Sequence, residues 1–345
     1  MRRRRVTLLP VDDERGASTR YRVLAYLPFL ARAGYETDVR YPAGNRAAGP
    51  SRPLWRGLDL MQDLLQTVSE DLLLIHRKTY PAPLARLLRR RGRPLVFDMD
   101  DALDLPPPSR RAGEAERRRY RANFEATVAQ ADLVLCGNRE LASRLPHDRY
   151  ALLPTPLDTD RFAPDAVDPP RGKVLGWVGH ADNLAYLERL ADPLRELARR
   201  HPGLRLVVVA DRPPALPGLD VEFRRWSLAT EVECFSGIGV GLMPLEDTAW
   251  ARGKCAFKAI QYMALGRPAV VSPVGMNREV VRNGENGFLA SGDAEWLEAL
   301  DRLLSDPGLA ARMGDRARRS VVRDYSLEVI ASRLLERIDG LISER

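Results

Sequence analysis

Two lysines stand four positions apart in the segment WARGKCAFKAIQYMALGRP, residues 250–268, and the whole chain contains only two others. The pattern predicts a helix over 254–265, and the start of a helix attracts phosphate through its free N–H groups and its dipole. At about 100° per residue, Lys254, Lys258 and Gln261 fall within about 60° of one another on this helix. The segment therefore predicts a phosphate-binding site. The alternative is a pair of exposed lysines on a surface helix.

Acidic residues end the apolar run PLVFDMDDAL in the first half of the chain. Asp98, Asp100 and Asp101 have no basic residue beside them in the sequence, so their charges are costly to bury unless they face a cleft. Carboxylates in a cleft serve as general acids or bases, or as ligands of a divalent metal ion. Asp98 and Asp100 are therefore candidate catalytic residues.

Further polar residues stand where other strands of the first half are predicted to end. The turn after the first strand contains two arginines, whose planar side chains could hold a phosphate through two hydrogen bonds. Ser18 or, better, Thr19 in this turn could instead cap the next helix. A histidine and an arginine end the third strand, and this histidine could equally be a buried or solvated structural residue. The candidates on this side of the cleft are Gly16, Ser18, Arg20, Arg22, His76, Arg77 and Asn138, the last of which could be only a helix cap.

Short apolar runs alternate with amphipathic stretches along the whole chain. The runs are continuous, as in DLLLIH and DLVLC, which is typical of parallel strands buried on both faces. Strands are predicted at 6–11, 36–41, 71–76, 94–98, 132–136 and 150–153, and then at 174–179, 205–210, 221–226, 239–244 and 268–273. Helices are predicted at 19–33, 81–91, 112–130, 138–145, 183–200, 228–235, 254–265 and 276–282, and the tail 293–343 is predicted to be helical throughout.

A proline-rich segment, LLPTPLDTDRFAPDAVDPPRGK, separates the two series and has the composition of a linker. Two βα series predict an α/β protein with two doubly wound, Rossmann-like domains that face each other across a cleft. The expected domains are 1–165 and 166–325, followed by a helix over 326–345 that could pack back on the first domain. Ligands of such folds lie beyond the carboxyl ends of the strands, which is where the candidate residues stand.

The net charge of +7 lies wholly in residues 1–165, which carry 29 basic and 22 acidic side chains, whereas residues 166–345 carry 25 of each. Basic runs such as 2–5, 86–93 and 117–120 could contact an anionic membrane or be only a solvated surface. No recognition-helix, zinc-finger or aromatic-rich sheet motif indicates nucleic acid. Three cysteines without a CxxC pair indicate neither disulfides nor a zinc site. With no apolar run of membrane-span length and no signal peptide, we expect a cytoplasmic protein, at most peripheral at the inner membrane face.

Several segments resemble, in the same order along the chain, motifs of glycosyltransferase family four, a GT-B family also described as glycosyl transferases group 1. The segment 250–268 and the following VVSPVGMNREVVRNGENGFLA resemble its donor-binding region. PTPLDTDRFAP resembles its interdomain signature. GASTRYRVLAYLPFLARAGYE, VFDMDDAL and GWVGHADNLAYLERL resemble members that act on bacterial surface polysaccharides. The resemblance implies a GT-B fold and a nucleotide-sugar donor.

The resemblance also assigns roles to particular residues. Retaining members usually carry two glutamates where this chain has Gly253 and Gln261; Gln261 could still bond ribose hydroxyls, and Gly253 offers only its backbone. A carboxylate near the donor sugar would then be Asp98, where relatives often place a histidine, or Glu246, Asp247 or Glu279. Glu279 could instead be only an acid in the first turn of a helix. The donor-binding residues implied are Gly179, His180, Gly253, Lys254, Lys258 and Gln261.

The resemblance implies a retaining hexosyltransferase in polysaccharide biosynthesis that acts on a glycan, lipid-linked or small-molecule acceptor. No cofactor is expected: Asp-x-Asp resembles a metal motif of the GT-A fold, but the second βα domain and the two lysines argue against a metal site. The missing glutamate pair supports an alternative, a non-catalytic GT-B protein that binds sugar nucleotide or glycan as a partner subunit. A nicotinamide-dependent oxidoreductase is disfavoured, because the first strand leads into DDERGAS and not into a GxGxxG loop.

Overall fold

The computed structural model describes residues 4–42, 63, 70–89, 93–108, 110–170 and 172–343. The chain forms two compact units, one of Met1–Pro156 with Leu327–Arg345 and the other of Leu157–Ser326. The sequence placed the boundary after residue 165, whereas the second unit begins at Leu157 and takes in most of the proline-rich segment. Arg2 and Arg3 of the basic tip and residues 90–92 of the basic run 86–93 lie outside the described residues.

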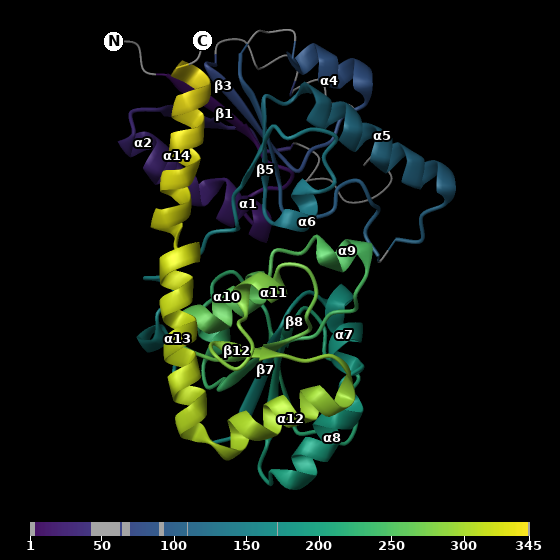
Figure 1. The fold of residues 1–345 in the computed structure, drawn as a ribbon, viewed down its shortest axis with the longest axis vertical. Coiled ribbons are helices and arrows are strands. Elements are labelled where there is room, and N and C mark those ends of the chain that lie inside the picture. Colours follow the sequence, from purple (N-terminus) through teal and green to yellow (C-terminus); the bar gives the residue numbers. More distant parts are fainter. Residues whose placement is uncertain are drawn as a thin grey trace. The chain divides into compact units, whose positions relative to one another are not determined.

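The first unit is built on a six-stranded sheet in the order β2-β1-β3-β4-β5-β6, and all of its pairings are parallel (Figure 1). Its strands are β1 (Arg5–Leu9), β2 (Glu36–Val39), β3 (Leu72–His76), β4 (Leu95–Met99), β5 (Leu133–Cys136) and β6 (Tyr150–Leu152). β3 and β4 are buried at every residue, as expected for parallel strands with continuous apolar sequences. The six strands predicted in this half are confirmed.

One helix of the first unit comes from the end of the chain. α14 (Leu327–Ser343) buries Ile330, Leu334 and Ile338 in the same apolar cluster as Val6 of β1 and Tyr26. The other helical segments are α1 (Ala17–Arg22), η1 (Leu24–Tyr26), α2 (Leu27–Arg32), α4 (Ala82–Arg89), α5 (Glu114–Gln130) and α6 (Arg139–Ala142). The helix predicted over 19–33 is thus three short segments that begin at Ala17.

The second unit contains another six-stranded parallel sheet, in the order β12-β11-β10-β7-β8-β9. Its strands are β7 (Val174–Val178), β8 (Arg205–Ala210), β9 (Val221–Arg225), β10 (Val240–Met243), β11 (Ala269–Val271) and β12 (Gly287–Leu289). Five of these were predicted, and β12 was not. The strand order reverses between β7 and β10, so the segments that follow these two strands are where a ligand is expected.

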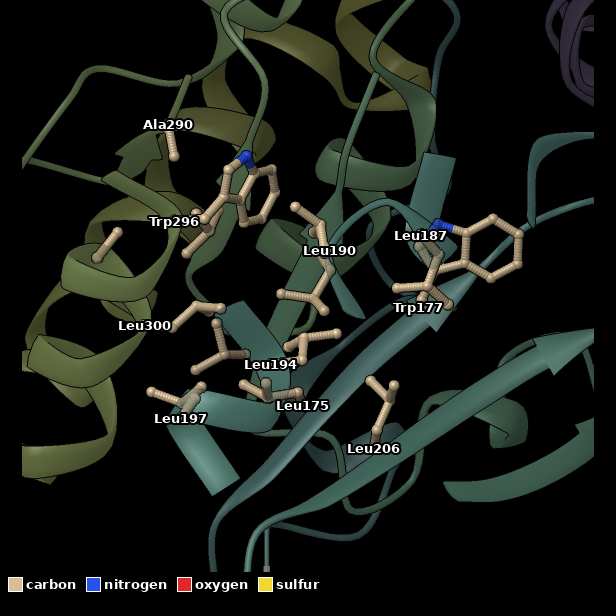
Figure 2. Packing of buried hydrophobic residues seen from close by; sticks show 14 of the residues in the cluster. Leu175, Trp177, Leu187, Leu190, Leu194, Leu197, Leu206, Ala290, Trp296 and Leu300 are labelled. Carbon is tan, nitrogen blue, oxygen red and sulfur yellow. The ribbon is translucent and has the colours of Figure 1, made fainter. Parts of the chain in front are cut away.

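Helices cover both faces of the second sheet (Figure 1). Val240 and Leu242 of β10 belong to the apolar cluster formed with α7, α8 and α12, part of which is drawn in Figure 2. Gly241, between them, faces Tyr262 of α10 on the other side, because successive strand residues point to opposite faces. The helical segments are η3 (Pro164–Ala166), η4 (Ala181–Asn183), α7 (Leu184–Glu188), α8 (Ala191–Arg200), η5 (Glu233–Phe235), α9 (Ala249–Arg252), α10 (Phe257–Ala264), α11 (Asn277–Val280), α12 (Gly292–Ser305) and α13 (Pro307–Tyr325).

Three further helix predictions differ from the structure. The helix predicted over 183–200 is two helices, α7 and α8, which are interrupted at Arg189 and Leu190. Residues 228–235 contain only the short η5. The tail that was predicted as one helix is three helices, α12, α13 and α14, with interruptions at Asp306 and at Ser326. The Asp306 side chain caps α13, which explains the first break. Within the described ranges, no helix is long and apolar enough to cross a membrane.

The contact between Gly241 and Tyr262 predicts a large effect of a small substitution. An alanine Cβ at position 241 would lie 2.1 Å from Cγ of Tyr262. The ring cannot shift freely, because Tyr262 is buried and its hydroxyl accepts a hydrogen bond of 2.8 Å from the Val178 N–H. Gly241→Ala should therefore lower the free energy of unfolding by about 1–3 kcal/mol in a urea titration. Gly340→Ala in α14 should cause no loss, because among the described residues no atom outside the adjacent part of the same helix lies within 4 Å of the added Cβ.

Candidate functional site

The first part of the candidate site is the start of α10. The helix begins at Phe257, later than predicted, because Ala256 adopts the left-handed conformation with a φ of 51°. This conformation is uncommon for a residue with a side chain. Lys254 therefore lies in the turn before the helix, and Gly253 is the C-cap of α9. The prediction that both lysines lie on one helix is wrong for Lys254.

Lys258 and Gln261 form a pair on the first turns of α10. Nζ of Lys258 donates a hydrogen bond of 2.8 Å to Oε1 of Gln261. Gln261 was predicted to lie on the open side of the helix, and this is wrong, because its side chain is only 1% exposed. It is buried because α10 packs between the sheet and α13. Lys258 itself is partly exposed, and its ammonium group lies where a helix start favours an anion.

The segment after β7 contributes two residues with different roles. Position 179 requires glycine, because a Cβ there would lie 2.5 Å from the ring of Trp177. His180 caps η4 through its ring nitrogen, and about two thirds of its side chain is exposed. This histidine is thus open to a ligand at the point where the strand order reverses.

The acidic candidates of the second unit are at its surface. Glu246 forms an ion pair of 2.9 Å with Arg189, and Asp247 forms one of 2.6 Å with Arg252, whose hydrogen bond lowers the Asp247 pKa. Glu279 lies in the first turn of α11 and is exposed. Glu246 and Asp247 line a pocket that also includes residues of α12, which packs on the face of the sheet away from α10.

In the first unit, a buried ion cluster lies at the carboxyl edge of β3 and β4. The register of these strands places His76 opposite Asp98, and Nδ1 of His76 lies 2.7 Å from the Asp98 carboxylate. Arg22 of α1 binds the same carboxylate through Nε at 2.9 Å and through its terminal NH2. All three side chains are at most 2% exposed. Burial alone would raise the Asp98 pKa, but the charge of Arg22 and the bond to His76 lower it.

The remaining donor nitrogen of Arg22 is also used inside the protein. It donates to the Leu153 carbonyl at 2.8 Å and lies 3.2 Å from the Thr155 hydroxyl. All three guanidinium nitrogens of Arg22 are therefore engaged inside the protein, and its predicted role as a phosphate ligand is wrong. No local pattern points to these partners, because Arg22, His76 and Asp98 come from three separate segments.

A partly exposed group of side chains lies beside this cluster. Oγ of Ser18 is 2.9 Å from Nε2 of His76 and donates a hydrogen bond to Asp100. Arg77, whose φ is 61°, forms ion pairs with Asp100 at 3.4 Å and with Asp101 at 2.6 Å. Burial would raise the Asp100 pKa, but Arg77 and, after it, His76, Arg22 and the Ser18 bond lower it to about 2. Asp100 is therefore a charged carboxylate suited to accept hydrogen bonds from hydroxyl groups.

Other predicted residues of the first unit have structural roles. Gly16 is the N-cap of α1, and Thr19, predicted as the cap, lies inside α1 and donates to the Asp12 carbonyl. Arg20 donates to the carbonyls of residues 14 and 15. The Asn138 side chain caps α6 by accepting a hydrogen bond of 2.8 Å from the Leu141 N–H. Over the described ranges, no group of three His, Cys, Asp or Glu residues could hold a metal ion.

Comparison with known proteins identifies relatives of both units. Residues 172–306 match the family model Glycosyl transferases group 1. A D-inositol 3-phosphate glycosyltransferase of Salinispora arenicola is 28% identical over 286 residues, which cover 72% of this chain and 63% of that protein. The chain thus matches less than two thirds of that relative.

Two solved structures share the fold of the whole chain. Sucrose-phosphate synthase of Thermosynechococcus elongatus has a TM-score of 0.76 and 16% identity, covering 99% of this chain and 100% of that one. HepE of Anabaena, solved with UDP and glucose, has a TM-score of 0.70 and 13% identity, covering 98% of this chain and 100% of that one. At these identities the likeness concerns the fold, and it confirms the GT-B class predicted from the sequence.

The buried ion cluster predicts a strong dependence of stability on Arg22. Arg22→Met would leave the Asp98 charge enclosed with only His76 as a partner, so the free energy of unfolding should fall by about 3–5 kcal/mol. Arg5→Met is a matched control, since Arg5 of the same unit forms an exposed ion pair of 2.8 Å with Glu36. Its loss should cost less than about 1 kcal/mol in the same urea titration. Equal losses in the two variants would contradict the role given to the cluster.

Proposed function

We propose that this chain, whose residues 172–306 match the group 1 glycosyltransferases, transfers a hexose from a nucleotide-sugar donor to a hydroxyl group of an acceptor. The observation that carries the proposal is the lysine at the first turn of α10, at the carboxyl edge of the second sheet. A leaving nucleoside diphosphate gains negative charge as the sugar departs, so fixed positive charge at this point favours the reaction.

On the donor side, Lys258 and Lys254 would neutralise the diphosphate without a metal ion, and the buried Gln261 would hold the ammonium group of Lys258 in place. The bond from the anomeric carbon to the phosphate oxygen breaks, and its electron pair stays with the diphosphate. The acceptor oxygen forms the new bond to the anomeric carbon. We assign retention of the anomeric configuration, as in related retaining enzymes, with the acceptor proton passing to the departing diphosphate. UDP-glucose is the first donor to test, because the structure of HepE contains UDP and glucose.

On the acceptor side, Asp100 and Ser18 would form hydrogen bonds with hydroxyl groups of the acceptor. A carboxylate that stays charged down to about pH 2 accepts hydrogen bonds throughout the physiological range. A glycan, a lipid-linked sugar or a small polyol offers such hydroxyls. A lipid-linked acceptor would bring the protein to the cytoplasmic membrane face, where the arginines of α5 could contact anionic lipid; Arg118 and Arg121 each already pair with a glutamate of this helix.

The donor site predicts a loss of affinity when its lysines are removed. Lys258→Ala should weaken UDP-glucose binding about tenfold or more in isothermal titration calorimetry, since a hydrogen bond to a charged phosphate is lost. Lys173→Ala is the control, because Lys173 precedes β7, at the opposite edge of the sheet, and contacts His201. The affinity of the Lys173→Ala variant for UDP-glucose should match that of the wild type. An unchanged affinity in the Lys254→Ala/Lys258→Ala double variant would reject the phosphate site.

The reaction itself predicts slow release of UDP from UDP-glucose, lost in Lys258→Ala and unchanged by EDTA. Proton NMR of the released or transferred glucose should show the α-anomer first, because UDP-glucose is an α-linked donor. A β-anomer would show inversion, and loss of activity in EDTA would show that a metal is needed. UDP-sugar binding without any release would favour the non-catalytic alternative suggested by Gly253 and Gln261.

A further inference from the structure

A pocket of about 350 Å³ lies on the flank of the second unit, within the size range of small-ligand sites. Its walls are the segments after β10 and β11, the second half of α7 with Arg189 and Leu190, and the first turns of α12. Leu190, Ala290 and Trp296 line its apolar part, and Figure 2 shows these three side chains at the upper end of the core cluster.

This pocket is separate from the start of α10. Part of its wall comes from α7 and α12, which pack with Val240 and Leu242 on one face of the sheet. α10 covers the other face, where Tyr262 packs against Gly241. Lys254, Lys258 and Gln261 are not among the residues that line the pocket.

The indole N–H of Trp296 is the feature that points to a ligand. Trp296 is 3% exposed and lines the pocket. In the part of the chain that the structure describes, its N–H has no protein acceptor, and the nitrogen atom itself is not sealed from solvent. Figure 2 shows the indole nitrogen turned away from Leu194, Leu197 and Leu300 of the core. The donor is therefore available to a molecule in the pocket.

The rim of the pocket determines which chemistry fits. Three carboxylates, Glu246, Asp247 and Asp293, and two arginines, Arg189 and Arg278, line it, so its formal charge is −1. The net charge disfavours a phosphate or another anion. Glu246 already pairs with Arg189 and Asp247 with Arg252, so a ligand would add hydrogen bonds to these carboxylates and would meet Asp293, Arg278 and the indole N–H. Hydroxyl groups provide both, and a sugar ring also has an apolar face for the indole and leucine.

We propose that this pocket binds an uncharged saccharide ring at a site distinct from the nucleotide-sugar site. The Trp296 N–H and Arg278 donate to the sugar oxygens, and Asp293 and Glu246 accept from its hydroxyls. The pocket is linked to α9 by one ion pair, in which Arg252 of α9 binds Asp247 of the rim.

The five tryptophans of the chain allow a direct test. In an ¹⁵N-labelled sample of the full chain, Trp296→Phe identifies the Trp296 indole resonance by its disappearance. Titration with D-glucose, D-galactose, D-mannose and N-acetyl-D-glucosamine should move this resonance for at least one sugar. An oligosaccharide that ends in the same sugar is then titrated. It should bind more tightly than the monosaccharide if the pocket accepts the end of a glycan. If none of these sugars moves the resonance, the proposal is wrong.

Variants separate this site from the donor site. Trp296→Phe keeps the apolar wall and removes only the donor, so the affinity measured on the remaining resonances should fall about fivefold. Trp177→Phe, a change of another buried indole of the same cluster that does not line the pocket, should leave the affinity unchanged. Lys258→Ala should also leave sugar binding unchanged, even if it abolishes nucleotide binding. Displacement of the sugar by UDP or inorganic phosphate alone would overturn the proposal, because the pocket would then belong to the donor site.

Discussion

The first unit depends on the buried contact of Asp98 with Arg22 and His76. A carboxylate as enclosed as this one is tolerated only when paired cations and hydrogen bonds replace water. The partners come from α1 and from β3, so the cluster fixes α1 against the carboxyl edge of the sheet. Ser18 of α1 is thereby held between His76 and Asp100. The partly exposed polar group that we assign to the acceptor is thus positioned by charges buried beneath it.

The second unit positions its candidate site by close packing instead of by a buried charge. Gly241 leaves room for the Tyr262 ring, and the Tyr262 hydroxyl binds the backbone of β7. These contacts set how closely α10 approaches the two strands at which the strand order reverses. Burial raises the Tyr262 pKa, so its hydroxyl keeps its proton and remains a neutral anchor. The polar residues of this unit can then lie on the rim, where a charged ligand remains partly hydrated.

The sequence predicted the sheets well because a strand buried on both faces must be apolar throughout, as in DLLLIH. It missed β12, which has only three residues and begins with glycine. It also missed the break before α10, since alanine is a strong helix former and nothing marks Ala256 as left-handed. Asp98 was expected to lack a basic partner because Arg22 lies 76 positions away and meets it only after the sheet forms. Local patterns therefore predicted the elements, and long-range contacts decided what each polar residue does.

The pair formed by Lys258 and Gln261 also bears on the missing glutamates. Helical spacing placed these two residues on one side of α10, and the structure confirms their contact at 2.8 Å. A glutamate at position 261 would form an ion pair with Lys258 and cancel much of the positive potential at the start of the helix. Glutamine binds the ammonium group and leaves its charge in place. The bond also restricts the lysine side chain, so less conformational entropy is lost when an anion binds. Glutamine in place of the glutamate that the resemblance leads us to expect is therefore compatible with a site for a diphosphate.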